Sequence, residues 1–216
     1  MTARGGQVLG AVRHPIGNAD FASFLLQAQG SGADVLGLAN AGGDLSNTIK
    51  QAAEFGIPQK MKMAGIILVP NNVHALGLPA AQGLSATSSF YWDRTDAARA
   101  WSKTFQARHS KKFMPNDMQA GVYGVLTHYF KAVAQRNDAA DGAAIVQTMK
   151  VTPTDDPLFG TGTIRQDGRK LHPMYALQTK TPAESKGDWD YFKVVGSIPG
   201  EEAFRPLDQG NCPLVK

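Results

Sequence analysis

Residues 33–56 constrain the fold more than any other stretch, because they join a short apolar run, a turn of small residues and an amphipathic pattern. The run 35–38 (VLGL) predicts a strand that is covered on both faces. Asp44 follows the turn at the place of a helix N-cap, and the apolar stripe behind it ends at Gly56. In an open α/β sheet, the loop after the carboxyl end of a strand is the usual ligand position.

The same alternation runs through the first 90 residues. Apolar runs predict strands at 7–12, 35–38, 63–69 and 83–88, and helical patterns between them predict helices at 21–30, 45–55 and 73–78. Alternating strands and helices favour a parallel open sheet with flanking helices, so the predicted fold class is α/β.

The pattern changes after residue 90. Three helices are predicted in succession, at 95–109, 120–133 and 143–149, with no strand between them to receive their apolar faces. Strands return at 161–165, 174–179 and 191–195, and the Asp-Gly pair within 166–169 predicts a hairpin turn. Residues 199–216 show little periodicity and are expected to form an irregular tail.

Several classes of function find no support in the motifs. The sequence has no P-loop, no nucleophile elbow and no His-Glu-x-x-His motif, and Cys212 is its single cysteine. We therefore expect no enzyme activity, no cofactor and no metal. The net charge of +4 comes without interleaved basic and aromatic residues, so nucleic acid is not an expected partner. No apolar run approaches the ~20 residues of a membrane span.

A resemblance emerges from the order of several segments. Residues 6–57 closely resemble the type I periplasmic solute-binding proteins of ABC importers, in the branch of leucine/isoleucine/valine-binding proteins and their aromatic-acid relatives. Matching segments follow in the same order along the chain, at 73–78, 90–93, 120–123, 164–169 and 202–207. No single motif is diagnostic, but their order and spacing together are specific.

The resemblance implies an organisation into two lobes. Residues 1–90 and 170–198 are expected to form the second α/β lobe, and residues 91–169 the helices and crossovers of an incomplete first lobe. Segments 90–93 and 164–168 resemble two of the crossovers, although an ordinary connecting strand is the alternative. The chain thus resembles the carboxyl-terminal part of such a protein. It opens without a signal peptide, and a periplasmic location is implied by the family alone.

The resemblance also suggests where a solute binds. In this family the ligand lies between two lobes that close by hinge motion. We expect the backbone N–H groups of Asn40, Ala41 and Gly42, with the helix that follows, to receive a carboxylate. A tight turn with a simple cap is the alternative for these residues.

Ile67 is another candidate ligand contact, and the segment around it bears on the kind of solute. Amino-acid binders of this family carry an acidic residue after the next strand, whereas residues 66–69 are all apolar here. Because a buried ammonium group without a partner is costly, we expect an aromatic or aliphatic carboxylate rather than a free α-amino acid. A branched-chain amino acid remains the other candidate.

Three further residues are candidate ligand contacts. His14 follows the first predicted strand, and Met118 and Gln119 lie where the resemblance places a ligand-facing helix of the first lobe. A structural role is the alternative for His14, which stands beside a proline.

The predicted function is that of the substrate-binding component of an ABC transporter, here truncated, with permease subunits in the membrane as partners. A ligand-sensing regulatory module of the same fold is the alternative. Without the sheet of the first lobe, large side chains such as Trp101 and Phe130 would lack cover. We therefore expect the chain to be loosely folded and aggregation-prone beyond about residue 90, and to bind its ligand weakly.

Overall fold

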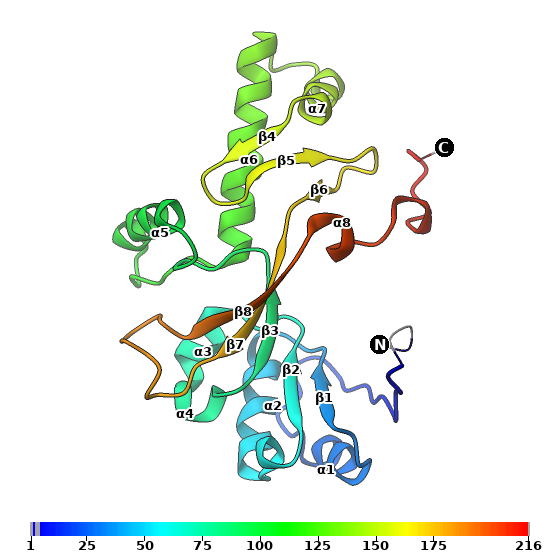
Figure 1. Cartoon of the computed structure of the whole chain (residues 1–216), viewed down its shortest axis with the longest axis vertical. Helices are drawn as coiled ribbons and strands as arrows, with labels where there is room; N and C mark the ends of the chain where they lie inside the picture. Colours follow the sequence, from blue (N-terminus) through cyan, green and yellow to red (C-terminus); the bar gives the residue numbers. More distant parts are fainter. Residues whose placement is uncertain (1, 3–4, 216) are drawn as a thin grey trace. The chain divides into compact units, whose positions relative to one another are not determined.

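A computed structural model describes residues 2 and 5–215 of the chain (Figure 1). The chain forms two compact units. Unit 1 comprises the residues up to Thr87 together with Leu177–Lys193, and unit 2 comprises Ser88–Ala176 together with the residues from Val194 onward. Among the described residues, no helix is long and apolar enough to cross a membrane.

The main sheet has five strands in the order β1-β2-β3-β7-β8. β1 pairs with β2, and β2 with β3, in parallel register, with Val35 opposite Lys62 and Leu38 opposite Gly65. This pairing confirms the predicted parallel α/β arrangement. The strands are β1 (Val35–Leu38), β2 (Lys62–Gly65), β3 (Ser85–Ser88), β7 (Met174–Thr179) and β8 (Phe192–Ile198).

Helices of unit 1 alternate with these strands in the chain. The elements are α1 (Ala22–Gly30), α2 (Gly42–Glu54), the 3-10 turn η2 (Ile57–Gln59), α3 (Pro70–Leu76) and α4 (Leu78–Ala81). α2 buries Leu45, Ile49 and Ala52, as its amphipathic pattern predicts. Gly56 ends the helical segment at φ +67°, a conformation that costs glycine little.

The predicted strand at 7–12 does not form. This segment has no secondary structure, and Val8 is 60% exposed. The expectation that the 35–38 strand is covered on both faces is wrong as well, since Val35 is 45% exposed. Both errors have one cause, because β1 is the edge strand of the sheet. An apolar run becomes a strand only where a neighbour pairs with it.

Two boundaries in unit 1 differ from the prediction. The predicted 63–69 strand ends at Gly65, where the chain turns back on itself. The turn is tight, since a Cβ on Gly65 would lie only 2.8 Å from Leu68 Cβ. Asp44 is not the N-cap of α2. α2 begins at Gly42 (φ +57°), three residues before the predicted start, with Ala41 as N-cap, and Asp44 Oδ2 accepts a hydrogen bond from Gly17 N (3.0 Å) instead.

Unit 2 contains the three predicted helices and a small antiparallel sheet. The helices are α5 (Asp96–Arg108), α6 (Asp117–Arg136) and α7 (Gly142–Val151). The sheet has the order β4-β5-β6, with β4 (Thr154–Asp156), β5 (Gly160–Ile164) and β6 (Lys170–Leu171). α6 contacts β4, and α7 contacts β5. α6 and α7 therefore have a sheet to pack on, although no strand lies between them in the sequence. The short elements α8 (Gly200–Ala203) and η3 (Leu207–Gln209) follow β8.

The segment predicted as a crossover at 164–168 belongs to a hairpin within unit 2. Arg165 N donates to Arg169 O (2.8 Å), and Gly168 adopts φ +83° in the loop between β5 and β6. The chain passes between the units at Thr87/Ser88, Ala176/Leu177 and Lys193/Val194. The hairpin between β5 and β6 also confirms the turn that the Asp-Gly pair within 166–169 predicts.

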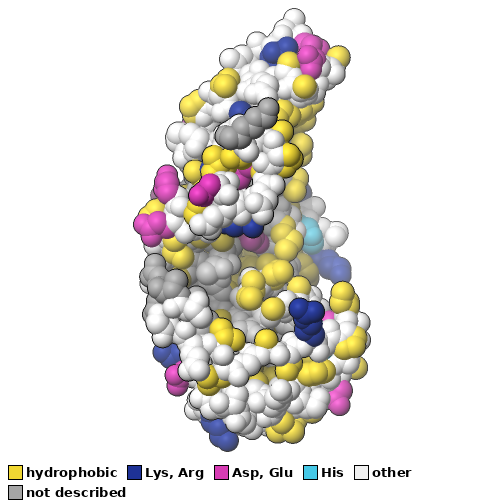
Figure 2. Space-filling model, turned by 90° about the vertical axis from the view of Figure 1, so that its right-hand side faces the viewer, with side chains coloured by type: hydrophobic (Ala, Val, Ile, Leu, Met, Phe, Trp, Pro, Cys, Tyr) yellow, Lys and Arg dark blue, Asp and Glu magenta, His cyan; other side chains and the backbone are white. Residues whose placement is uncertain are grey.

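Hydrophobic side chains reach the surface in several places (Figure 2). The largest group lies on α6, which buries small residues on one face and exposes large apolar ones elsewhere. The buried residues are Ala120, Gly124, His128 and Ala132, and the exposed ones are Met118, Val122, Tyr123, Val125, Leu126 and Phe130. We call these six exposed residues the α6 apolar face.

Candidate functional site

A cavity of about 580 Å³ lies in unit 1 at the carboxyl end of β1. Its walls come from residues 12–16, from α1, from β1 and from the start of α2. His14, Asn40 and Ala41, three of the predicted contacts, line it together with Asp44 and Thr48. The cavity therefore occupies the place where an open α/β sheet usually holds its ligand. We call it the β1 cavity.

Hydrogen bonds hold the β1 loop against the first turns of α2. Asn40 Nδ2 donates to Thr48 Oγ1 (2.8 Å), and the Thr48 hydroxyl donates to Asp44 O (2.7 Å). Asn40 Oδ1 is buried and has no hydrogen-bond partner among the described residues. This network fixes the loop and leaves one strong acceptor unused.

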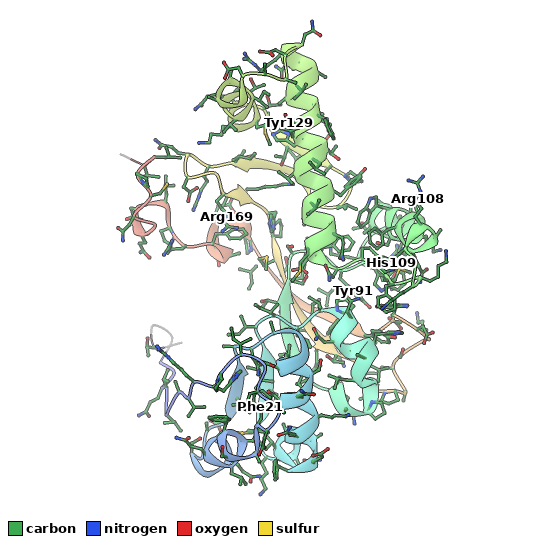
Figure 3. All side chains as sticks on the ribbon, turned by 180° about the vertical axis from the view of Figure 1, so that it is seen from behind. Phe21, Tyr91, Arg108, His109, Tyr129 and Arg169 are labelled. Carbon is green, nitrogen blue, oxygen red and sulfur yellow. The ribbon has the colours of Figure 1, made fainter. Side chains whose placement is uncertain are left out.

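Aromatic side chains form another wall of the β1 cavity. The His14 ring meets Phe21 edge-on, with ring centroids 4.9 Å apart, and lies 6.1 Å from the ring of Phe24. His14 Nδ1 is 2.8 Å from Pro15 O, which orients the imidazole. Phe21 is labelled in Figure 3 and is almost completely buried. The cavity thus combines apolar rings with a few polar groups, as small-molecule sites do.

The other predicted contacts lie elsewhere. Gly42 begins α2 but does not line the β1 cavity, and Ile67 is 44% exposed in the turn between β2 and α3. Met118 and Gln119 line a separate hollow of unit 2, between α5 and α6.

The hollow between α5 and α6 has a volume of about 600 Å³ and mainly aromatic walls. The Trp101 and Tyr123 ring centroids are 5.1 Å apart, and Phe105 stacks on His109 at 5.5 Å. His109 and Arg108 stand at the end of α5 (Figure 3). The four-residue spacing of Trp101, Phe105 and His109 predicts one helix face, but spacing alone does not distinguish a core face from an open hollow.

Electrostatics in unit 2 single out Asp117, the first residue of α6. Burial raises the pKa of its carboxyl, while the N–H groups of Asp117 and Met118 and the Ser88 side chain act in the opposite direction. Among the described residues, no group of three or more His, Cys, Asp or Glu side chains could hold a metal ion.

The comparisons identify the family. A family model described as a periplasmic binding protein matches residues 1–188, and the chain belongs to this family. Its resemblance to type I periplasmic binding proteins of ABC transporters is thereby confirmed, as is the α/β fold class.

Two solved structures are similar over the whole of this chain. A periplasmic binding protein from Burkholderia mallei is 48% identical (TM-score 0.92), with all of this chain and 56% of that chain covered. A branched-chain amino acid ABC transporter periplasmic ligand-binding protein from Burkholderia xenovorans is 39% identical (TM-score 0.88), with coverage of 100% and 57%. The chain thus spans a little over half the length of these relatives.

A more distant structure shares the fold alone. It is an ABC transporter solute-binding protein from Rhodopseudomonas palustris in complex with 4-hydroxybenzoate, at 18% identity and a TM-score of 0.82, covering 96% of this chain and 56% of that one. Comparison with curated proteins gives no match.

Proposed function

We propose that this chain acts in the substrate-binding component of an ABC importer and captures a small organic solute. Family membership across residues 1–188 carries the proposal. The partners would be permease subunits in the membrane, and the place of action the periplasm. Because the chain spans little more than half of its relatives, the role of a whole relative comes to it as a proposal only.

The β1 cavity is the proposed solute contact within unit 1. α2 begins directly after the loop of Asn40 and Ala41, and a helix N-terminus favours an anion. Phe21, Phe24 and His14 offer ring surfaces beside it. These features support an aromatic or aliphatic carboxylate. The roles predicted for Gly42, Ile67, Met118 and Gln119 stay predictions.

Asp44, which the sequence predicts only as a helix cap, adds a charged group to the β1 cavity. Its side chain lies in the first turn of α2 and its residue lines the β1 cavity. A carboxylate solute at the helix terminus would be repelled by Asp44, whereas the ammonium group of an amino acid would be attracted. Arg13 lines the same cavity and acts in the opposite sense, so replacing Asp44 alone isolates the effect of its charge on the choice between a carboxylate and a branched-chain amino acid.

Calorimetry on the chain, with benzoate and leucine as probes, tests the assignment. We expect benzoate to bind and Asp44→Asn to strengthen it about threefold to tenfold, since a like charge is removed. Asp34→Asn is the matched control, because it removes the same charge from an exposed position outside the cavity lining. Leucine binding that Asp44→Asn weakens would overturn the carboxylate assignment. Binding of neither probe would count against the β1 cavity.

A further inference from the structure

A second, smaller cavity lies inside unit 2, away from the hollow between α5 and α6. It measures about 210 Å³ and is bounded by α6, α7, β5 and the β5–β6 loop, with Thr154 of β4 and His172 beyond β6 also in its wall. We call it the α6–β4 cavity. An apolar cavity of about 150 Å³ is enough to hold a benzene molecule. The α6–β4 cavity therefore has room for one small ring or a molecule of similar size.

Glycine keeps this space open. A Cβ on Gly121 would meet no atom within 4 Å, so no packing contact requires a glycine there. Gly124, one turn later, differs, because its Cβ would lie 3.3 Å from Asp156 Oδ2 and 3.4 Å from the Phe159 ring. A glycine within a helix lowers helix stability relative to alanine, and at position 121 it leaves this exposed part of the cavity wall without a side chain.

Two buried polar atoms belong to residues that line the cavity. His128 Nε2 is 2.9 Å from Met149 O, and since a carbonyl only accepts, Nε2 carries the proton in the neutral ring. Nδ1 of His128 is then an acceptor. Neither this atom nor Thr154 Oγ1 has a hydrogen-bond partner among the described residues, and both side chains are more than nine-tenths buried. Buried polar groups are normally satisfied, so each calls for a partner.

The charges of the wall are already balanced. Lys170 Nζ pairs with Asp156 Oδ2 at 2.7 Å and lies 4.7 Å from the centre of the Phe159 ring. Burial, together with the nearby Lys170 and Arg169, lowers the pKa of His172, which favours its neutral form at pH 7. A charged ligand would lose its hydration and find no unpaired counter-charge. The wall therefore selects a neutral molecule.

We propose that the α6–β4 cavity is a binding site for a small neutral molecule with a hydroxyl group and an apolar body about the size of one ring. The ligand hydroxyl donates to His128 Nδ1, and its oxygen accepts from the Thr154 hydroxyl. Its apolar body contacts Met149, Ile164 and Phe159. Phenol matches this description in size, charge and donor.

Ligand-observed NMR on the whole chain tests the site with two probes, phenol and toluene. We expect phenol to bind at least about tenfold more tightly than toluene, which has the same size but no hydroxyl. Equal binding of phenol and toluene would overturn the proposal, because it would show that the polar atoms play no part.

Variants then locate the binding. Gly121→Leu, at an exposed part of the wall, should narrow the cavity and weaken phenol binding, and Thr154→Val should weaken it about tenfold at nearly constant volume. Thr161→Val is the control, an exposed threonine on the neighbouring strand β5. Circular dichroism verifies that each variant folds. If Gly121→Leu does not fold, Thr154→Val alone tests the proposal. Phenol binding that survives both substitutions, for example in the hollow between α5 and α6, would overturn the assignment.

Discussion

The helices of the two units bury their large apolar side chains to different extents. In unit 1, α2 turns its apolar residues inward, and Leu45 has no exposed surface. In unit 2, α6 buries mainly small residues, and Phe130 on the α6 apolar face is 62% exposed. The β4–β6 sheet has three short strands, of which β4 contacts α6 and β5 contacts α7. A helix needs a cover as wide as its apolar stripe, and three short strands do not supply it.

The comparison predicts that large side chains stabilise unit 1 far more than they stabilise the α6 apolar face. Leu45→Ala should lower the free energy of unfolding by about 2–5 kcal/mol, because it leaves a cavity in a close-packed core. Phe130→Ala should change it by less than about 0.5 kcal/mol, as expected of an exposed position. Urea unfolding followed by circular dichroism measures both. A similar loss in the two variants would mean that Phe130 is covered in solution, and the contrast between the units would fail.

Backbone packing offers a second contrast, within unit 1. Gly65→Ala places a methyl group 2.8 Å from Leu68 Cβ, so the β2–α3 turn must shift, at a cost of about 1–3 kcal/mol. Gly37→Ala is the matched control in β1, since its Cβ would meet nothing within 4 Å. Its effect on the free energy of unfolding should stay within about 0.5 kcal/mol. Equal effects would show that the tight turn after β2 is not what ends the strand.

One carboxyl group in each unit should have a shifted pKa, and the two shifts should have opposite directions. In unit 1, hydrogen bonds from Lys193 and Thr181 lower the pKa of Glu184 to about 2. Its contribution to stability is therefore complete above the unfolded pKa of about 4.5 and is lost as the pH falls toward 2. In unit 2, burial raises the pKa of Asp117, so protonation of this group favours the folded state as the pH falls.

NMR titration of the side-chain carboxyl carbons measures both groups. Lys193→Met should move the pKa of Glu184 upward, whereas Lys186→Met, in the loop that carries Glu184, should leave it in place. Ser88→Ala should raise the pKa of Asp117 further, because the Ser88 side chain holds it down. An Asp117 that titrates below its ordinary value would contradict the burial of this carboxyl.

The smallest expected effect concerns association rather than folding. Leu126→Ser and Phe130→Ser together should reduce binding of a hydrophobic dye and self-association in sedimentation velocity, because they interrupt the α6 apolar face. Val151→Ser, an exposed apolar position at the end of α7, is the control. Dye binding that both sets of variants leave unchanged would place the accessible apolar surface elsewhere.

Much of the fold follows from local pattern. The helices at α5, α6 and α7, the strands at β5, β7 and β8, and the hairpin turn at 166–169 lie where periodicity and turn residues predict them. These signals are local, because a helix stripe, a cap such as Thr95 or an Asp-Gly turn depends on residues only a few positions apart.

Other features depended on partners that a linear pattern does not name. The apolar run at 7–12 reads as a strand, yet nothing pairs with it, and β1 becomes an edge. The sequence predicts Asp44 as a helix cap, yet α2 begins earlier, at Gly42 with its positive φ. The side chain of Asp44 accepts a hydrogen bond from Gly17 N instead. Likewise, the sequence by itself indicated the family and predicted His14, Asn40 and Ala41 as ligand contacts. Only the tertiary structure decided that they share a cavity, and that Met118 and Gln119 line another, because burial and pairing arise between segments far apart in the chain.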